Sequence, residues 1–202
     1  MWRFWNQVNT HYLMDAMRGA NGKGIDTEKA LASPADLYIG VADFATGKPH
    51  LLKPETGEEL LTAIQASILM PNVTSDIVTF RDIRYADGGF TSPHVLSVAL
   101  DEIEATHILI LANQEKEVTT IPFLERFFNH TLFRMRMPGP LRFAAHERRK
   151  ERIKAIEKMK KRRDISYALV WGDRSVRSME RDPMIVKDAI VRSKAWAHKL
   201  LG

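Results

Sequence analysis

The sequence contains no cysteine among its 202 residues. This absence excludes disulfides, thiolate zinc sites, cysteine-ligated iron–sulfur clusters and cysteine nucleophiles. No apolar run approaches the roughly 20 residues that a membrane-spanning helix needs, and residues 1–6 lack the apolar segment of a signal peptide. We therefore expect a cytoplasmic protein.

Several sequence patterns of known enzyme sites are also missing. The eleven glycines never flank a serine as G-x-S-x-G, and no G-x-x-x-x-G-K phosphate loop is present. No two of the seven histidines lie within one helical turn, which excludes the spacing of helical zinc proteases. We accordingly expect neither a metal nor another cofactor.

The residues that are present predict a mixed α/β fold. Hydrophobic residues make up 45% of the chain and charged residues 27%, a balance that supports a packed core. Segments with helical spacing alternate with short apolar segments. Two of the latter, 107–112 and 166–171, are almost continuously apolar and are predicted to be strands buried on both faces. The expected helices span residues 2–17, 58–70, 93–103, 123–133, 141–163 and 183–201, and the expected strands span 37–44, 50–52, 77–80, 83–85, 107–112 and 166–171.

Positive charge is concentrated in one segment. Residues 134–163 hold 13 Lys or Arg and three Glu, a net charge of +10, whereas the whole chain carries +5. Such a segment is typical of a solvated helix face, but it also suits contact with phosphate groups on an anionic membrane or on nucleic acid. The basic residues considered as substrate or membrane contacts are Arg148, Arg149, Lys150, Lys160, Lys161, Arg162 and Arg163.

The sequence Tyr85-Ala86-Asp87-Gly88-Gly89 is the strongest candidate for a functional site. It places an aspartate at the end of a short predicted strand, followed by two glycines that permit positive φ angles and a tight turn. A carboxylate held there lies at the edge of a sheet, where strand ends build sites. Because Asp-Gly is also common in ordinary turns, the motif alone does not assign a function.

Further motifs surround this one in a definite order. Residues 41–48 (VADFATGK) are a predicted strand that runs into a T-G turn, and residues 66–71 (ASILMP) are a helix end closed by proline. After the D-G-G motif, Ser92-Pro93 leads into a helix and then into the strand at 107–111. Taken in this order, the motifs resemble the C-terminal half of the patatin-like phospholipase family, in particular its bacterial members. The resemblance covers about residues 13–201.

The resemblance implies a three-layer α/β/α sandwich and the hydrolysis of acyl esters in lipids. In that family, a serine in a G-x-S-x-G turn attacks the ester carbonyl, and an aspartate in the D-G-G or D-G-A motif acts directly as its base. The resemblance makes Asp87 that base, with Gly88 and Gly89 supporting it. A carboxylate is a weak base for a hydroxyl group, so it needs direct contact and a dry surrounding.

The sequence departs from the family because it has neither the serine turn nor the glycine-rich loop that supplies the oxyanion donors. Both would precede residue 1. We therefore expect the C-terminal portion of a longer acyl hydrolase, inactive on esters alone, which needs the missing half or self-association. Residues 1–133 would carry the D-G-G part of the incomplete catalytic domain. Residues 134–202 would form a basic helix, a final strand and a closing helix packed on the same domain.

Two serines near the motifs do not replace the missing nucleophile. Ser92 is too close to Asp87 in sequence for the two side chains to converge at a helix start. Ser67 lies on a predicted helix and is expected to pack against the sheet.

The alternative function is a non-catalytic binding module that uses residues 134–163 on anionic membrane or nucleic acid. The segment contains one aromatic residue, Phe143, so base stacking has little support and we expect no nucleic acid partner. The expected partners are a lipid or ester substrate and, peripherally, an anionic membrane.

Overall fold

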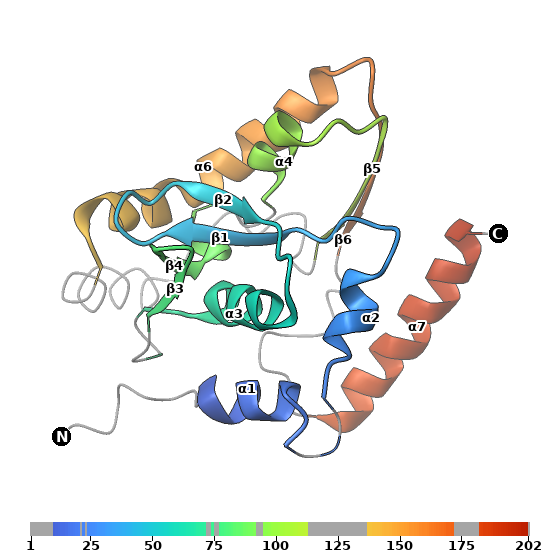
Figure 1. The fold of residues 1–202 in the computed structure, drawn as a ribbon. Helices are drawn as coiled ribbons and strands as arrows, with labels where there is room; N and C mark the ends of the chain where they lie inside the picture. The colour runs from blue at the N-terminus through green and yellow to red at the C-terminus, as the bar shows by residue number, and fades with distance from the viewer. Residues whose placement is uncertain are drawn as a thin grey trace. The chain divides into compact units, whose positions relative to one another are not determined.

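The computed structural model describes residues 10–20, 22, 24–71, 74, 77–91, 95–112, 137–171 and 182–201. The chain forms two compact units. The first comprises Met1–Ala105 and Pro122–Arg163, and the second comprises Thr106–Ile121 and Asp164–Gly202. Each unit combines helices with strands (Figure 1), which confirms the predicted mixed α/β class. The boundary predicted after residue 133 lies outside the described residues and stays a prediction.

Five of the described helices lie within or near predicted ones, with several ends that differ by a few residues, whereas the helix at Thr27–Leu31 and the 3₁₀ turn at Gly88–Phe90 were not predicted. The helix predicted at 123–133 lies outside the described residues. No described helix combines the length and the apolar composition that crossing a membrane requires. The helices are α1 (Thr10–Met17), α2 (Thr27–Leu31), α3 (Gly57–Ile68), the 3₁₀ turn η1 (Gly88–Phe90), α4 (Leu96–Glu102), α6 (Gly139–Lys161) and α7 (Pro183–Leu201).

A four-stranded sheet forms the centre of the first unit. Its strands are arranged in the order β2-β1-β4-β3, and every neighbouring pair is antiparallel. Val41 in β1 lies opposite His50 in β2 on one side and Asp87 in β4 on the other. Parallel pairing, within the described residues, is confined to the second unit. The four strands are β1 (Ile39–Asp43), β2 (Pro49–Leu52), β3 (Val78–Phe80) and β4 (Ile83–Asp87).

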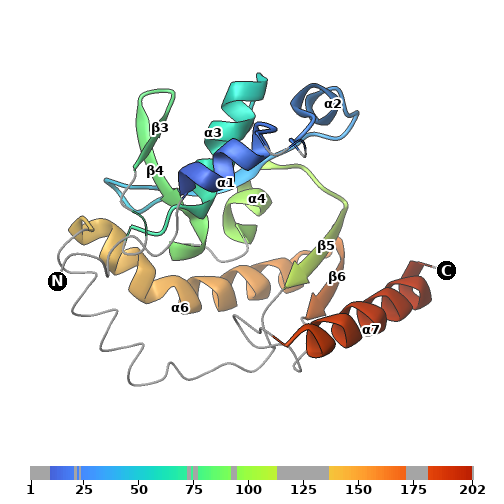
Figure 2. The ribbon, with the colours of Figure 1, turned by 90° about the horizontal axis from the view of Figure 1, so that it is seen from below.

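The side chains of β1 point alternately to the two faces of the sheet, as successive side chains of a strand do. The core of this unit is therefore divided into two parts, one on each face. Val41 is fully buried against α3, where it packs with Ala63 and Ala66. Ala42 faces the other way and packs with Leu141 of α6. Figure 2 shows α3 and α6 on opposite sides of the sheet. The sheet of the first unit therefore lies between two helical layers.

An ion-pair cluster holds the β3–β4 hairpin to the start of α3. Arg81 and Asp82 form the turn with φ angles of 45° and 66°, the left-handed region that a two-residue hairpin turn requires. Arg81 donates to both carboxylate oxygens of Glu59, at 2.8 and 2.9 Å, and lowers the pKa of Glu59 to about 2. Glu59 also caps α3, since its Oε2 accepts the N–H of Glu55 and its N–H donates to Thr56 Oγ1. The cluster thus connects the hairpin directly to the helix cap.

The second unit contains two parallel strands, β5 (His107–Ala112) and β6 (Ser166–Trp171), and helix α7. Both strands have the predicted bounds, but the prediction that they are buried on both faces is wrong. Leu109 and Leu111 are 58% and 71% exposed, whereas Ile110 and Ala112 on the other face are buried. The reason is that no described residue of this unit covers the face that carries Leu109 and Leu111.

The close approach of β1 to η1 predicts that Gly88 cannot be replaced. A Cβ atom at Gly88 would lie 2.7 Å from the carbonyl oxygen of Gly40 and 3.0 Å from the backbone nitrogen of Val41. Because backbone atoms of a central strand cannot move aside, we expect Gly88→Ala to lower the free energy of unfolding by about 1–3 kcal/mol, as overpacking does. Urea denaturation measures this change.

The matched control is Gly139→Ala at the start of α6. A Cβ there would meet only the Arg142 guanidinium, at an ordinary 3.9 Å. We expect an unfolding free energy close to that of the unsubstituted chain. Equal stability of Gly88→Ala and Gly139→Ala would contradict the close approach at Gly88.

Candidate functional site

Asp87 is the last residue of β4, and η1 begins directly after it. Its side chain is half-buried, and its Oδ1 accepts the N–H of Gly89 at 2.8 Å. The D-G-G motif therefore forms a short 3₁₀ turn, in which a backbone N–H of the motif binds the carboxylate. Neither Gly88 nor Gly89 adopts the positive φ angle that glycine permits. The glycines instead allow close approach: of β1 at Gly88, and of the Asp87 carboxylate at Gly89, where a Cβ would lie 3.1 Å from Oδ1.

The predicted motifs make two separate contacts in the first unit. The N–H of Asp87 donates to the carbonyl oxygen of Leu69 at 3.0 Å, which joins the D-G-G motif to the helix end closed by proline. The T-G turn after β1 reaches the start of α6. There Gly47 has a φ angle of 69°, and a Cβ on it would lie 2.8 Å from the carbonyl oxygen of Pro140. Two pairs of segments that are far apart in the sequence thus meet in the first unit: the D-G-G motif meets the helix end, and the T-G turn meets the start of α6.

Burial raises the pKa of Asp87 above its ordinary value of 3.8. The hydrogen bond from Gly89 and the positive charge of Arg148 act in the opposite direction without cancelling the effect of burial. A carboxylate that is partly withdrawn from water holds a proton more strongly and is a better base toward a hydroxyl group.

Asp43, at the end of β1, gives a direct comparison. Burial works to raise the pKa of Asp43 as well, but the N–H groups of Thr46 and Ala45 donate to its Oδ1 at 2.9 and 2.7 Å and hold the pKa below 3.8. Two strand-end aspartates in one sheet therefore have pKa values shifted in opposite directions. The backbone donors outweigh the effect of burial at Asp43 and do not outweigh it at Asp87.

The predicted basic residues lie on α6 and directly after its end, and they differ in exposure. Arg148 is half-buried, and its charge acts on the carboxylate of Asp87. Lys150 is exposed and pairs with Glu147 at 2.8 Å. The sequence prediction did not distinguish the half-buried Arg148 from the exposed Lys150. Lys160, Lys161, Arg162 and Arg163 are exposed, and the side chain of Arg149 lies outside the described part of the chain.

The structure describes the surroundings of one of the two serines near the predicted motifs. Ser67 is half-buried in α3 and donates to the carbonyl oxygen of Ile64 at 2.8 Å. Ser92 lies outside the described residues. Asp101 at the end of α4 is exposed and pairs with Lys158. No group of three His, Asp or Glu that could hold a metal occurs among the residues that the structure describes.

An open cavity of about 340 Å³ lies elsewhere in the first unit. His50 and Tyr85 line it, with ring centroids 5.9 Å apart, whereas Asp87 does not. Two cations also line it, Lys53 and Arg81, but each is engaged by carboxylates of the same unit. The cavity is therefore separate from the Asp87 turn, and its cations have partners already.

The raised pKa of Asp87 predicts how stability depends on pH. Because the folded chain holds this proton more strongly than the unfolded chain, the contribution of Asp87 is most favourable below the unfolded pKa and is lost as pH rises through the folded pKa. We therefore expect Asp87→Asn to raise the urea midpoint at pH 7 and to leave it nearly unchanged at pH 3.

Asp43→Asn is the control, for which the expected change in stability has the opposite sign. Its lowered pKa adds stability above the unfolded pKa, and this stability is lost as pH falls through the folded pKa. We expect Asp43→Asn to lower the midpoint at pH 7. A lower midpoint at pH 7 for both variants would mean that the Asp87 carboxylate is stabilised, not penalised, in the fold.

No family model matches the chain, and no curated protein matches it. The function of the site is therefore inferred from its own residues and from the resemblance of its sequence motifs.

Proposed function

We propose that this chain supplies the aspartate base of a patatin-like lipid acyl hydrolase. The observation that carries the proposal is the Asp87 turn, which unites the D-G-G motif, the end of α3 and a carboxylate whose pKa is raised by burial. An ordinary Asp-Gly hairpin turn would leave its carboxylate in water. The sheet between two helical layers supports the same proposal, since a three-layer sandwich is what the resemblance implies.

The proposed chemistry uses Asp87 twice. Its carboxylate accepts the proton of a serine hydroxyl while the serine oxygen attacks the carbonyl carbon of an acyl ester. The protonated Asp87 then donates this proton to the departing alcohol, which leaves an acyl-serine. Water then attacks the acyl carbon while Asp87 accepts its proton, and Asp87 passes this proton to the serine oxygen as the acyl–serine bond breaks, which releases the fatty acid and restores the serine. The serine must come from a G-x-S-x-G segment, which the 202 residues do not contain.

The experiment combines sequence reading with an ester assay. We expect DNA upstream of the Met1 codon to encode a G-x-S-x-G segment. The chain alone should not hydrolyse a fluorogenic short-chain ester, whereas the chain together with that segment should. Asp87→Asn should then lower the turnover by about 10²–10⁴-fold, the usual contribution of a general base.

Asp43→Asn is the matched control, because Asp43 is also a strand-end aspartate that accepts backbone N–H groups. It should keep most of the activity. Full turnover in Asp87→Asn, or an upstream sequence without the serine motif, would refute the proposal.

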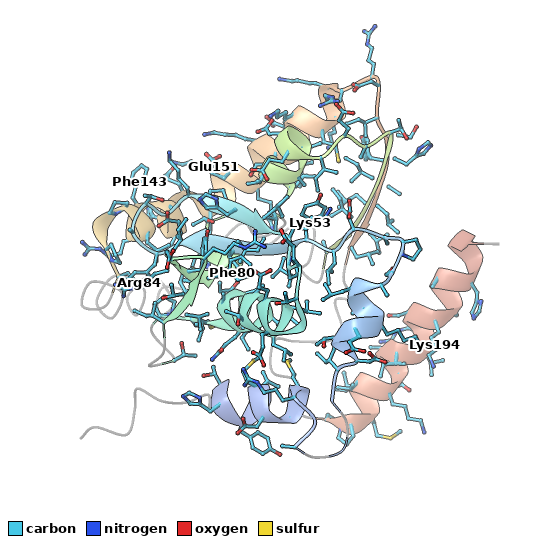
Figure 3. All side chains as sticks on the ribbon, in the orientation of Figure 1. Lys53, Phe80, Arg84, Phe143, Glu151 and Lys194 are labelled. Carbon is cyan, nitrogen blue, oxygen red and sulfur yellow. The ribbon has the colours of Figure 1, made fainter. Side chains whose placement is uncertain are left out.

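A second function, contact with an anionic membrane, is favoured by the outward face of α6. Phe143 and Ile153 are 70% and 53% exposed there. The exposed Lys150 and Lys154 lie on the same helix, and Figure 3 shows Phe143 and Glu151 along it. Exposed apolar side chains among lysines are typical of helices that lie at a membrane surface.

This proposal predicts that vesicle binding depends on the charge of α6. The chain should co-sediment with phosphatidylcholine vesicles that contain phosphatidylglycerol, and not with phosphatidylcholine alone. The double variant Lys150→Gln/Lys154→Gln should bind the anionic vesicles at least about tenfold more weakly, because each lysine contributes about 1 kcal/mol near an anionic surface. The control Lys187→Gln/Lys194→Gln removes the same charge from exposed positions of α7 and should bind normally. Equal binding to both kinds of vesicle refutes an electrostatic contact.

A further inference from the structure

The open cavity beside the β3–β4 hairpin reaches the hydrophobic core of the first unit. Its volume of about 340 Å³ is at the lower end of the range for pockets that bind small molecules. Three of its lining residues, Leu52, Phe80 and Tyr85, are buried and belong to the core cluster that contains Val41 and Ala63. All the residues that line it lie in the first unit. The cavity is therefore an opening in the surface that exposes apolar side chains of the core to a ligand of modest size.

Tyr85 brings a polar atom to this apolar lining. The residue is only 4% exposed, and its hydroxyl group makes no hydrogen bond with any residue that the structure describes. Burial and the nearby charge of Asp43 raise the pKa of Tyr85 above its ordinary value of 10.0, so the hydroxyl group keeps its proton at neutral pH. A buried hydroxyl group normally has a hydrogen-bond partner, because leaving it without one costs free energy. The cavity that Tyr85 lines is the place for this partner, which is water in the empty site and a ligand in the filled one.

Two further rings shape the cavity. The His50 ring stands at 69° to the Tyr85 ring, with the ring centroids 5.9 Å apart, and both rings line the cavity. Phe80, which is labelled in Figure 3, lines it as well. Aromatic rings prefer edge-to-face and offset contacts with other rings. A lining of three rings therefore favours a ligand that is itself a flat ring.

The charged groups of the lining are already paired within the first unit. Lys53 lies 2.6 Å from Asp36, and Arg81 lies 3.0 Å from Glu55 and 2.8 Å from Glu59. An ionic ligand would lose water and gain no charged partner that is not engaged already. The lining therefore favours an uncharged ligand.

We propose that this cavity binds a small, uncharged aromatic molecule with one hydrogen-bonding group, of which a phenol is the simplest kind. The ligand ring packs among His50, Phe80 and Tyr85, and the ligand hydroxyl group forms a hydrogen bond with the Tyr85 hydroxyl group. Both hydroxyl groups can donate and accept, so the pair is satisfied in either direction. The site does not depend on the proposed function, because Asp87 does not line the cavity.

The first test is an NMR titration of the full chain at pH 7 with 4-methylphenol, which is uncharged at that pH. We expect saturable shifts of the amide signals of His50, Phe80 and Tyr85. Toluene lacks the hydroxyl group and should bind about five- to tenfold more weakly, which is the effect of losing one hydrogen bond. 4-Methylcyclohexanol lacks the aromatic ring and 4-methylbenzoate is charged, so both should also bind more weakly than 4-methylphenol.

The second test uses Tyr85→Phe, which removes only the hydroxyl group. It should weaken 4-methylphenol binding about five- to tenfold and leave toluene binding unchanged. Because the Tyr85 hydroxyl group has no partner in the described part of the chain, the substitution should not lower the urea midpoint, so any loss of binding is not a loss of fold. The matched control is Tyr167→Phe in β6, where the side chain is exposed. It should change neither binding nor stability.

Several results would overturn the site. They are no saturable shift with 4-methylphenol, equal affinity for 4-methylphenol and toluene, full affinity in Tyr85→Phe, and shifts confined to the exposed strand face at Leu109 and Leu111. A lower urea midpoint in Tyr85→Phe would mean that the chain itself satisfies the hydroxyl group, which contradicts the proposal. Equal or tighter binding of 4-methylcyclohexanol or 4-methylbenzoate would refute an uncharged aromatic ligand.

Discussion

The candidate site depends on one electrostatic constraint, the partial withdrawal of the Asp87 carboxylate from water. Burial raises its pKa, and the chain offsets this with one backbone N–H from Gly89 and with the nearby charge of Arg148. A carboxylate that served only a turn would gain more from the arrangement at Asp43, where two backbone N–H groups hold the charged form. The first unit therefore keeps at the end of β4 a carboxylate whose charged form is disfavoured by burial. Shifted pKa values of this kind are common at functional sites.

The packing around this carboxylate follows from the need to keep β1, β4 and η1 in contact. Gly88 lets η1 lie directly on the backbone of β1, and the N–H of Asp87 fixes the strand end to Leu69. Leu141 fixes the start of α6 against the same strands and lies in one cluster with Phe90 of η1. These contacts fix the start of α6, the helix whose Arg148 acts through its charge on Asp87.

The sequence allowed the prediction of local elements because hydrophobic spacing is a local property. The bounds of β5, β6 and α7 and the place of Asp87 at a strand end follow from such spacing. The antiparallel order of the sheet did not follow, since strand pairing depends on contacts between distant segments. The exposure of Leu111 could not be predicted either, because it depends on which layers cover the face. The inward position of Arg148 was predictable in principle, as it continues the spacing of Leu141 and Ala145.

The most direct test of the account is a ¹³C NMR titration of the Asp87 carboxyl carbon in the full chain, assigned by its absence in Asp87→Asn. The account predicts a midpoint above 3.8 for Asp87, a midpoint below 3.8 for Asp43, and a further upward shift of Asp87 alone in Arg148→Gln. A midpoint for Asp87 at or below 3.8 would contradict a buried base. A midpoint unmoved by Arg148→Gln would remove α6 from the site.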